Sequence, residues 1–488
     1  MQIYIVANST KDWPAQMPGV EVVDARTYLT DPAFSEQRNA KVFNLCRSYK
    51  YQTTGYYVSL LAEARGHKPL PNVATVRDLK NQSVVRMASE DLERLMESSL
   101  APIRSDKFVL SVYFGQNLAK RYEKLAQSLF NQFQSPLLRV YFSRSDSGWQ
   151  IRRVEPIAAN DVPASHLPFL IEAATTHFSN RRSPTRKSSK TRYDMAILHD
   201  PADPEPPSDE KALQRIIRAA AKMGINAELI TKDRFGNLAE YDALFIRETT
   251  CINNHTFRFS RKAAGEGLVV IDDPVSILRC TNKVYLAELL TRHKVPIPKT
   301  IVAHRDNASS IGTSLGFPLV LKKPDSAFSR GVVKVADESE LAVRLTEFFE
   351  ESDLVVAQEF LPTTFDWRIG IIDGQPLYAC KYYMADGHWQ IVHSERTGDS
   401  RYGRNETVPI ELAPQKAVKV ALKSANLIGD GLYGVDVKES GGKFYVIEVN
   451  DNPNLDANVE DSVLKDELYL RIMSVFLRRM EKQRTGYA

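Results

Sequence analysis

The stretch that decides the fold is residues 433–450, which read YGVDVKESGGKFYVIEVN. Two runs rich in β-branched and aromatic residues flank a Ser-Gly-Gly turn, a pattern typical of an antiparallel hairpin. Pairing the runs about the turn places Asp436 opposite Glu448, with Asn450 two residues further along. Because side chains alternate faces along a strand, these three polar groups are expected on one face. The core face is then expected to carry Val435, Val437, Tyr445, Ile447 and Val449.

Two carboxylates that face each other across a ladder repel, so the hairpin is expected to hold a cation between Asp436 and Glu448. Carboxylate and amide oxygens, without sulfur or imidazole, suit a hard ion such as Mg2+. The alternative is a solvated outer face on which acidic residues fall by chance. The sequence Asn-Asp-Asn-Pro-Asn at residues 450–454 favours the metal site.

Composition indicates a globular protein of several domains. The chain has 488 residues, of which 43% are hydrophobic and 25% charged, and its formal net charge of +4 is too small to indicate nucleic-acid binding. Its four cysteines show no paired spacing, which indicates a reducing compartment rather than a disulfide or zinc framework. No signal-peptide pattern and no run of about 18 apolar residues occurs, so we expect a cytoplasmic protein without a membrane span.

Residues 1–150 mix strand patterns (2–7, 108–114 and 138–142) with helical patterns (55–66 and 89–100), which predicts an α+β domain. A polar cluster at residues 44–52 leads into the first of these helices. It is interpreted either as an anion or substrate pocket or as a capped helix with surface tyrosines. Cys46 and His67 suggest nucleophilic chemistry only if they meet, and a buried structural thiol is the favoured interpretation.

Residues 151–192 form a connecting segment that ends in a basic, polar run at residues 179–192. This run is interpreted as a linker or exposed loop. Binding of nucleic acid or of an acidic partner is the less favoured interpretation, because no aromatic residues interleave with the basic ones.

Residues 193–280 predict an α/β domain with a parallel sheet. Apolar runs at 195–198, 227–230, 243–246 and 268–271 alternate with helical patterns, as in βαβ units. Arg247 follows the third run, and ligands of parallel sheets bind at the carboxyl ends of strands. Arg247 is therefore a candidate substrate contact, with a loop salt bridge as the alternative.

Residues 281–488 carry further charged groups at the ends of predicted elements. Lys283 begins a helix and Lys322 lies near the end of a strand, ahead of a small-residue loop at residues 325–332. A second hairpin at residues 366–383 turns at Asp-Gly. Its simplest register places Arg368 opposite Ala379 and Asp366 opposite Lys381, so that Asp366, Arg368 and Lys381 share one face. Three charges on one sheet face indicate a phosphate site. Neither the GxxxxGK[ST] motif nor the GxGxxG motif occurs.

These motifs, in this order, resemble the ATP-grasp superfamily over residues 193–480, and within it the RimK-like carboxylate–amine ligases. The phrases that carry the resemblance are Asn282-Lys283, Leu321-Lys322, Gln358-Glu359-Phe360, Asp366-Trp367-Arg368, Gly434-Val435-Asp436-Val437 and Glu448-Val449-Asn450-Asp451-Asn452-Pro453. Residues 42–49 and 55–63 resemble the N-terminal domain that accompanies such enzymes. The implied fold is α/β and α+β: a parallel-sheet domain, two α+β lobes that clasp ATP, and an extra N-terminal α+β domain.

The resemblance also implies roles for individual residues. Phosphates of ATP are expected to contact Lys283, Lys322 and a phosphate-binding loop. Relatives often have two or three glycines in this loop, whereas this chain has one, so side chains are expected to supplement the backbone donors. The implied loop residues are Ser326, Ser329, Arg330 and Gly331. Adenine and ribose are expected at Gln358 and Glu359, and Asp366 is a further implied nucleotide-binding residue. Arg368 and Lys381 are the implied catalytic residues. Two Mg2+ ions, with Mn2+ as a substitute, are expected on Asp436, Glu448 and Asn450. The implied substrate contacts are Arg247, Arg396 and Asn454.

The implied activity is an ATP- and Mg2+-dependent ligation through an acyl phosphate. It joins an amino acid, expected to be glutamate-like, to an amine of an amino acid, a peptide or a protein tail. Residues 393–398 match the family only loosely, so the acceptor is the least defined part. Relatives are often oligomers, which implies a homo-oligomer here. The alternative is a non-catalytic ATP-binding scaffold or regulatory protein. No membrane or nucleic-acid partner is expected.

Overall fold

The computed structural model describes residues 2–37, 40–79, 90–145, 148–179, 191–325, 331–392 and 402–485. The chain divides into two compact units. Unit 1 comprises Met1–Ser188 and Phe235–Glu240, and unit 2 comprises Ser189–Arg234 and Tyr241–Ala488. Residues 180–190, most of the predicted basic linker, lie outside the described residues.

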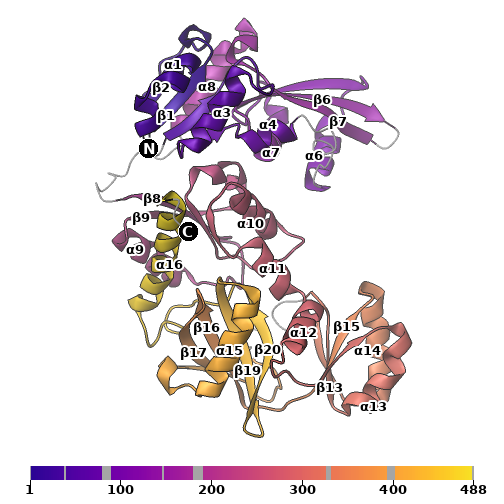
Figure 1. The fold of residues 1–488 in the computed structure, drawn as a ribbon. Helices are drawn as coiled ribbons and strands as arrows, with labels where there is room; N and C mark the ends of the chain where they lie inside the picture. Colours follow the sequence, from indigo (N-terminus) through magenta and orange to yellow (C-terminus); the bar gives the residue numbers. More distant parts are fainter. Residues whose placement is uncertain are drawn as a thin grey trace. The chain divides into compact units, whose positions relative to one another are not determined.

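The first sheet of unit 1 is parallel and has the strand order β2-β1-β3-β4. Its strands are β1 (Gln2–Ala7), β2 (Val20–Asp24), β3 (Ala40–Asn44) and β4 (Lys68–Leu70). Successive side chains of β1 point to opposite faces of the sheet and so pack in two different hydrophobic clusters. Tyr4 and Val6 pack with α1 (Ala25–Thr30) and α3 (Thr54–Ala64), whereas Ile5 packs on the side of α8 (Leu167–Ser179). Helices therefore cover both faces (Figure 1).

The second sheet of unit 1 is antiparallel and consists of β5 (Lys107–Tyr113), β6 (Leu137–Ser145) and β7 (Gly148–Pro156). Two helices, α6 (Glu90–Leu100) and α7 (Glu123–Phe133), contribute to its hydrophobic core. The strands and helices predicted for residues 1–150 are thus confirmed, with ends that differ by a few residues.

The polar cluster before α3 holds this helix against the sheet. The Asn44 side chain donates hydrogen bonds to Gly55 O (2.7 Å) and Ser59 Oγ (2.9 Å). Burial raises the pKa of the Cys46 thiol to about 12, and His67 instead contacts the Tyr28 hydroxyl and Gln37 O, both at 2.7 Å. Cys46 is therefore a structural thiol, as favoured from the sequence.

Unit 2 begins with a parallel sheet of order β11-β10-β8-β9, which confirms the predicted βαβ pattern. The strands are β8 (Tyr193–Leu198), β9 (Ile225–Ile230), β10 (Ala243–Ile246) and β11 (Val269–Ile271). Asp209 caps α9 (Glu210–Lys222) by accepting a hydrogen bond from Ala212 N. The last helix, α16 (Asp466–Thr485), returns to this sheet: Phe476 packs against Phe245 with ring centroids 5.3 Å apart.

A four-stranded antiparallel sheet of order β12-β15-β13-β14 follows. Its strands are β12 (Thr300–Ala303), β13 (Leu319–Lys322), β14 (Val332–Val335) and β15 (Val355–Glu359). The helices α13 (Ile311–Leu315) and α14 (Glu338–Glu351) cover one face and close its core. Lys322 and Gln358 lie on the other face of this sheet, where they line a cavity.

The last sheet is antiparallel and has the order β18-β17-β16-β19-β20. Its strands are β16 (Phe365–Ile372), β17 (Gln375–Tyr383), β18 (Asn405–Val408), β19 (Leu432–Ser440) and β20 (Lys443–Asn450). The apolar face packs against α11 (Pro274–Thr281), α12 (Lys283–Arg292) and α15 (Gln415–Ile428), so the opposite face is available for polar groups.

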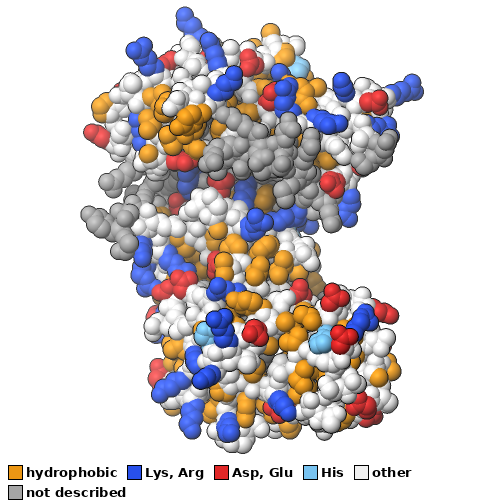
Figure 2. Space-filling model, turned by 45° about the vertical axis from the view of Figure 1, so that its right-hand side comes forward, with side chains coloured by type: hydrophobic (Ala, Val, Ile, Leu, Met, Phe, Trp, Pro, Cys, Tyr) orange, Lys and Arg blue, Asp and Glu red, His pale blue; other side chains and the backbone are white. Residues whose placement is uncertain are grey.

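The described surface mixes charges of both signs. On the face in Figure 2, Lys and Arg side chains are interspersed with Asp and Glu side chains and with hydrophobic ones. Over the described residues, no helix combines the length and the apolar character needed to cross a membrane.

Candidate active site

The hairpin β19–β20 has the predicted polar face. Asp436 pairs with Glu448 and Gly434 pairs with Asn450, and the turn lies between Ser440 and Lys443. The Asn450 amide nitrogen donates a 3.2 Å hydrogen bond to Asp436 Oδ2. The prediction that these three side chains gather on one face of the sheet is confirmed.

The predicted core face of the hairpin is partly wrong, because β20 contains a bulge. The register shifts after Asp436, so that Val437 pairs with Val446. An extra residue in one strand changes which side chains point inward beyond it. Val446 therefore enters the core, whereas Ile447 lines a cavity on the polar side.

Each opposed carboxylate has a cationic partner. Asp436 receives two hydrogen bonds from Arg368, from Nε at 2.5 Å and from Nη2 at 2.9 Å, and Glu448 Oε1 lies 3.0 Å from Lys283 Nζ. Burial raises the pKa of Asp436, while Arg368 opposes the shift. Burial also acts to raise the pKa of Glu448, but Lys283 and Lys322 bring it below its usual value. Both carboxylates therefore lie in a strongly charged, partly enclosed environment.

The buried lysine at the end of β13 lies in the same environment. Burial lowers the pKa of Lys322 to about 8; Glu448 opposes this shift, and Lys283 and Lys438 reinforce it. Lys438 was not singled out from the sequence. Its Nζ donates to Asp366 Oδ1 (2.7 Å) and Thr363 Oγ1 (2.6 Å). Lys438 lies two residues after Asp436 on the same strand, so strand alternation could have predicted that both side chains lie on the same face.

A cavity of about 130 Å³ lies among these lysines. It is lined by Lys283, Lys322, Lys438 and Asp366, and by Gln358 and Glu359 at the end of β15. The Gln358 amide donates to Thr300 Oγ1 at 2.8 Å, and Glu359 Oε1 accepts from Lys299 N at 2.7 Å. Three lysines along one enclosed surface make this cavity suitable for a polyanion.

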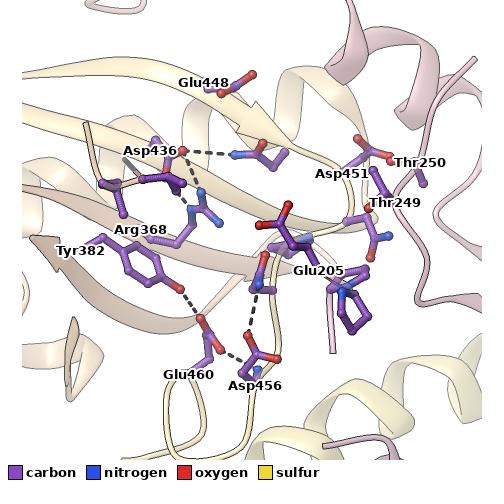
Figure 3. Close-up of a pocket in the computed structure, with 18 of the residues that line it drawn as sticks. Glu205, Thr249, Thr250, Arg368, Tyr382, Asp436, Glu448, Asp451, Asp456 and Glu460 are labelled. Atoms are coloured by element: carbon purple, nitrogen blue, oxygen red, sulfur yellow. Dashed lines mark hydrogen bonds and ion pairs between the residues drawn. The ribbon is translucent and has the colours of Figure 1, made fainter. Parts of the chain in front are cut away.

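A larger cavity of about 730 Å³ borders the smaller one. Asp436 and Glu448 line both cavities, so the two carboxylates lie where the cavities meet. Arg368 and Asn454 line the larger cavity, as does Glu460 (Figure 3). This arrangement brings the lysine-lined cavity and the larger cavity to the same pair of acidic groups.

The prediction for Lys381 is wrong. A register shift between Gly370 and Ile371 makes Arg368 pair with Cys380, and Lys381 pair with Trp367. Lys381 therefore lies on the face opposite to Arg368, where its Nζ is 3.2 Å from Glu406 Oε2 and 5.5 Å from the centroid of the Trp367 ring. The simple count from the Asp-Gly turn failed because a bulge adds a residue to the hairpin.

The prediction for Arg247 is also wrong. Its side chain is fully buried and donates hydrogen bonds to Ser208 Oγ (3.0 Å), Asn452 Oδ1 (2.5 Å) and the backbone oxygens of Pro207 and Pro453. These contacts use the guanidinium donors inside the protein. Arg247 fixes the loop that follows β20, and neither cavity is lined by it.

The remaining predicted residues divide into two groups. Asn454 lines the larger cavity, and its Nδ2 donates to Asp456 Oδ2 at 3.1 Å. Gly331 has a φ of +75° and accepts a 2.8 Å hydrogen bond from Lys323 N. Outside the described residues lie Ser326, Ser329, Arg330 and Arg396.

Gly434 allows the hairpin to approach its neighbours closely. A Cβ atom at this position would lie 2.7 Å from Pro453 Cβ and 2.8 Å from Arg368 Cδ. Gly434→Ala is therefore expected to displace Arg368 and to lower the free energy of unfolding by about 1–3 kcal/mol, the usual range for overpacking. Urea unfolding measures this loss. The matched control is Gly265→Ala, where nothing lies within 4 Å of the added Cβ; equal stability of the two variants would contradict the packing argument.

The acidic hairpin fits a hard divalent ion. It offers two carboxylates and one amide, all hard oxygen donors, on one face. Two of these residues line both cavities. Within the described residues no group of three or more His, Cys, Asp or Glu side chains could hold a metal ion. A metal here would therefore need oxygen donors from its other ligands, such as phosphates.

Comparison with known proteins agrees with this geometry. Residues 280–467 match the family described as "RimK-like ATP-grasp domain", and residues 25–173 match "RimK-like ATPgrasp N-terminal domain". The chain is 30% identical over 195 residues to an alpha-aminoadipate–LysW ligase, LysX, from Saccharolobus solfataricus, covering 38% of this chain and 67% of the relative.

A second relative is a tetrahydromethanopterin:alpha-L-glutamate ligase from Methanocaldococcus jannaschii, 27% identical over 257 residues, covering 50% of this chain and 84% of the relative. Among solved structures, a RimK domain ATP-grasp protein from Sphaerobacter thermophilus aligns with a TM-score of 0.44 at 18% identity, over 58% of this chain and 99% of that one. The chain belongs to the RimK-like ATP-grasp family and is an ATP-dependent carboxylate–amine ligase.

Proposed function

We propose that this ligase activates a substrate carboxylate as an acyl phosphate and transfers the acyl group to an amine. A carboxylate oxygen attacks the γ-phosphorus of ATP, and ADP leaves. The amine nitrogen then attacks the acyl carbon, forming a C–N bond, losing a proton and releasing inorganic phosphate. The observation that carries this proposal is the position of Asp436 and Glu448, which line both the lysine-rich cavity and the larger cavity.

The smaller cavity is proposed to bind the nucleotide. Lys283 and Lys322 would contact phosphate oxygens, while Gln358 and Glu359 would contact adenine and ribose. Asp366 is held by Lys438 and Thr363, so its proposed role is to position Lys438 rather than to touch ATP. Cations fixed around the phosphates align the nucleotide and neutralise its charge, which is most of what phosphoryl transfer requires of a protein.

Asp436, Glu448 and Asn450 are the residues that would hold Mg2+. When bound, the ion neutralises phosphate charge and orients the transferred group. Arg368 is proposed to orient the carboxylate or its phosphorylated form, because its guanidinium lies over the Tyr382 ring at 5.3 Å and lines the larger cavity. Fixed donors of this kind stabilise charge that develops during the reaction.

The substrates are proposed to be an amino acid and an amine of an amino acid, a peptide or a protein tail. The two relatives named above carry α-aminoadipate and α-L-glutamate in their names, which supports an amino-acid substrate. Mass spectrometry of the products distinguishes the acceptors, because a modified protein tail and a small peptide differ in mass by a wide margin.

The experiment that tests the function is ADP release by the purified chain with ATP, Mg2+ and pools of amino acids and amines. ADP that forms only when both a carboxylate and an amine are present, together with an amide product by mass, supports the ligase. Nucleotide binding without ADP release under any acceptor would instead support a non-catalytic ATP-binding protein.

The shifted pKa of Lys322 predicts a pH dependence of nucleotide binding. The charged ammonium attracts phosphate, and with a pKa of about 8 it loses its proton as the pH rises through that value. Above pH 8 the neutral Lys322 amine must take up a proton when ATP binds. The Kd for ATP is therefore expected to rise by up to about tenfold per pH unit, as the uptake of one proton requires. Lys322→Arg keeps its charge and is expected to show a flat profile. A pH-independent Kd for the unmodified chain would contradict this role.

A further inference from the structure

The three-stranded sheet of unit 1 has one face packed against helices and one open face. The helices α6 and α7 lie on one side of β6 and β7 (Figure 1), and Val140 and Val154 enter the hydrophobic core on that side. Strand alternation sends the neighbouring residues to the other face. One row across that face consists of Val109 in β5, Tyr141 in β6 and Arg153 in β7. Val109 is 49% exposed and the Arg153 side chain is 56% exposed, so this face is accessible.

The open face carries an excess of positive charge. Lys107 lies opposite Ser143, and Arg152, the extra residue at the register shift in β7, donates from Nε to Ser143 Oγ at 2.5 Å. Two cationic side chains therefore flank one hydroxyl. Arg153 lies in the next row of the face, and Arg139 lies in the row after that. Arg139 is half-buried, and the other three cations are exposed.

Little of this charge is neutralised by the sheet itself. Among the described residues of the three strands, Glu155 is the carboxylate that alternation places on this face, and its Oε1 lies 3.2 Å from Arg153 Nη1. Both side chains are well exposed, and an ion pair in such a position contributes little. Arg139 Nη2 donates to a backbone oxygen, that of Asp161, at 3.4 Å. Four cations and one carboxylate on one accessible face attract a polyanion.

The aromatic ring on this face favours an acidic polypeptide over a nucleic acid. The Arg153 guanidinium lies over the Tyr141 ring, 4.2 Å from its centroid. Single-stranded nucleic acids bind by stacking their bases on uncovered aromatic rings, and here a cation covers the ring. A guanidinium held flat on a ring has its orientation fixed, and its planar donors match a carboxylate in bidentate geometry.

The spacing of the cations matches an extended acidic chain. The rows of the face follow Ser143, Tyr141 and Arg139, which are two residues apart along β6. Two residues of a strand span about 7 Å, which is also the distance between side chains on one side of any extended peptide. A peptide that lies along β6 with an acidic residue at every second position therefore brings one carboxylate to each row.

We infer that this open face binds an acidic segment of a partner polypeptide, extended and with carboxylates on alternate residues. Arg152 and Arg153 pair with its carboxylates, and Lys107 and Arg139 add charge at the two ends of the face. The inference goes beyond the proposed ligase function and does not rest on it, because the face belongs to unit 1 and lines neither of the two cavities of the candidate active site.

The test measures binding of a fluorescein-labelled decapeptide of alternating glutamate and threonine to the full chain by fluorescence anisotropy. The comparison probes are the same peptide with glutamine in place of glutamate and a thymidine oligonucleotide of equal charge. The acidic peptide is expected to bind at least about tenfold more tightly than either, as two or three exposed ion pairs provide, and to weaken as salt is added. Equal binding of the neutral peptide or the oligonucleotide would overturn the inference. Displacement of the peptide by ATP would do so too, because it would place the peptide in the lysine-lined cavity.

Variants locate the bound peptide on the chain. Lys107→Gln combined with Arg153→Gln is expected to raise the Kd of the acidic peptide about tenfold. The control combines Lys120→Gln with Lys124→Gln, which removes the same charge from exposed positions just before α7 and in its first turn, and it should leave the Kd unchanged. Equal weakening by both double variants would reveal a general charge effect and overturn the inference.

A conservative variant separates carboxylate pairing from charge alone. Arg153→Lys retains the charge but loses the bidentate geometry, so its Kd is expected to lie between those of the unmodified chain and the double variant. ADP release with small substrates should be the same in all of these variants, so a failure of the inference leaves the ligase function standing. If a variant does not fold, the comparison of the three probes on the unmodified chain still decides the matter.

Discussion

Glu448→Ala is expected to lower ADP formation by about three orders of magnitude or more, the scale seen when a group that fixes charge in an active site is removed. The side chain has two functions here. It is paired with Lys283 Nζ at 3.0 Å, and it lines both cavities as one of the proposed metal ligands. Its loss would leave Lys283 without this partner and the phosphates without one ligand of their ion. ADP release at saturating ATP and varied Mg2+ measures the effect.

The hairpin supplies a matched control for this variant. Glu439 lies on the same strand pair, opposite Phe444, and is exposed. Glu439→Ala should retain full activity. Glu448→Gln keeps the size of the side chain and one carbonyl oxygen, so residual activity at high Mg2+ is expected for it alone. If Glu448→Ala turns over at the rate of the unmodified chain, Glu448 is not a metal ligand and the proposed site is wrong.

Arg247→Met is expected to reduce the free energy of unfolding of the chain by about 4 kcal/mol. The substitution removes donors from Ser208, Asn452 and the backbone oxygens of Pro207 and Pro453 in a fully buried position. Each buried acceptor left without its donor costs about 1–3 kcal/mol. Urea unfolding followed by tryptophan fluorescence measures the loss.

Activity is expected to fall with stability in this variant, because the loop held by Arg247 follows Asn450 directly and carries residues that line the larger cavity. Arg292→Met is the control: Arg292 is exposed in the last turn of α12, and surface changes usually stay within about 0.5 kcal/mol. A stable Arg247→Met protein with altered substrate preference would restore the interpretation of Arg247 as a substrate contact.

Asp436 pairs with Glu448 as predicted, but the turn alone does not set this register. Ser440 pairs with Lys443, and strict counting from that turn would place Ile447 opposite Asp436; the bulge between the turn and this pair brings Glu448 there instead. Counting from a turn therefore failed for Ile447 and Lys381. In both hairpins a bulge adds one residue to one strand, and nothing in the residue pattern marks that position.

Arg247 illustrates a different limit. The rule for parallel sheets correctly places it at the carboxyl end of a strand, where ligands bind. Its donors are nevertheless used by Asn452 and Pro453, about 200 positions later in the chain. The charge of Arg247 and its position after β10 can be read from the sequence, whereas its hydrogen-bond partners cannot.

The sequence by itself determined the order of the motifs, the family, and the shared face of Glu448 and Asn450, because motifs and strand alternation act over a few residues. That Asp436 faces Glu448 depends on the bulge in β20. Tertiary structure alone decided that Lys438 lines the smaller cavity, that the donors of Arg247 bind a loop inside the protein, and that Glu460 and Asp456 meet in the wall of the larger cavity. These outcomes depend on contacts between strands and loops far apart in the chain, and their energies exist only once those segments have packed.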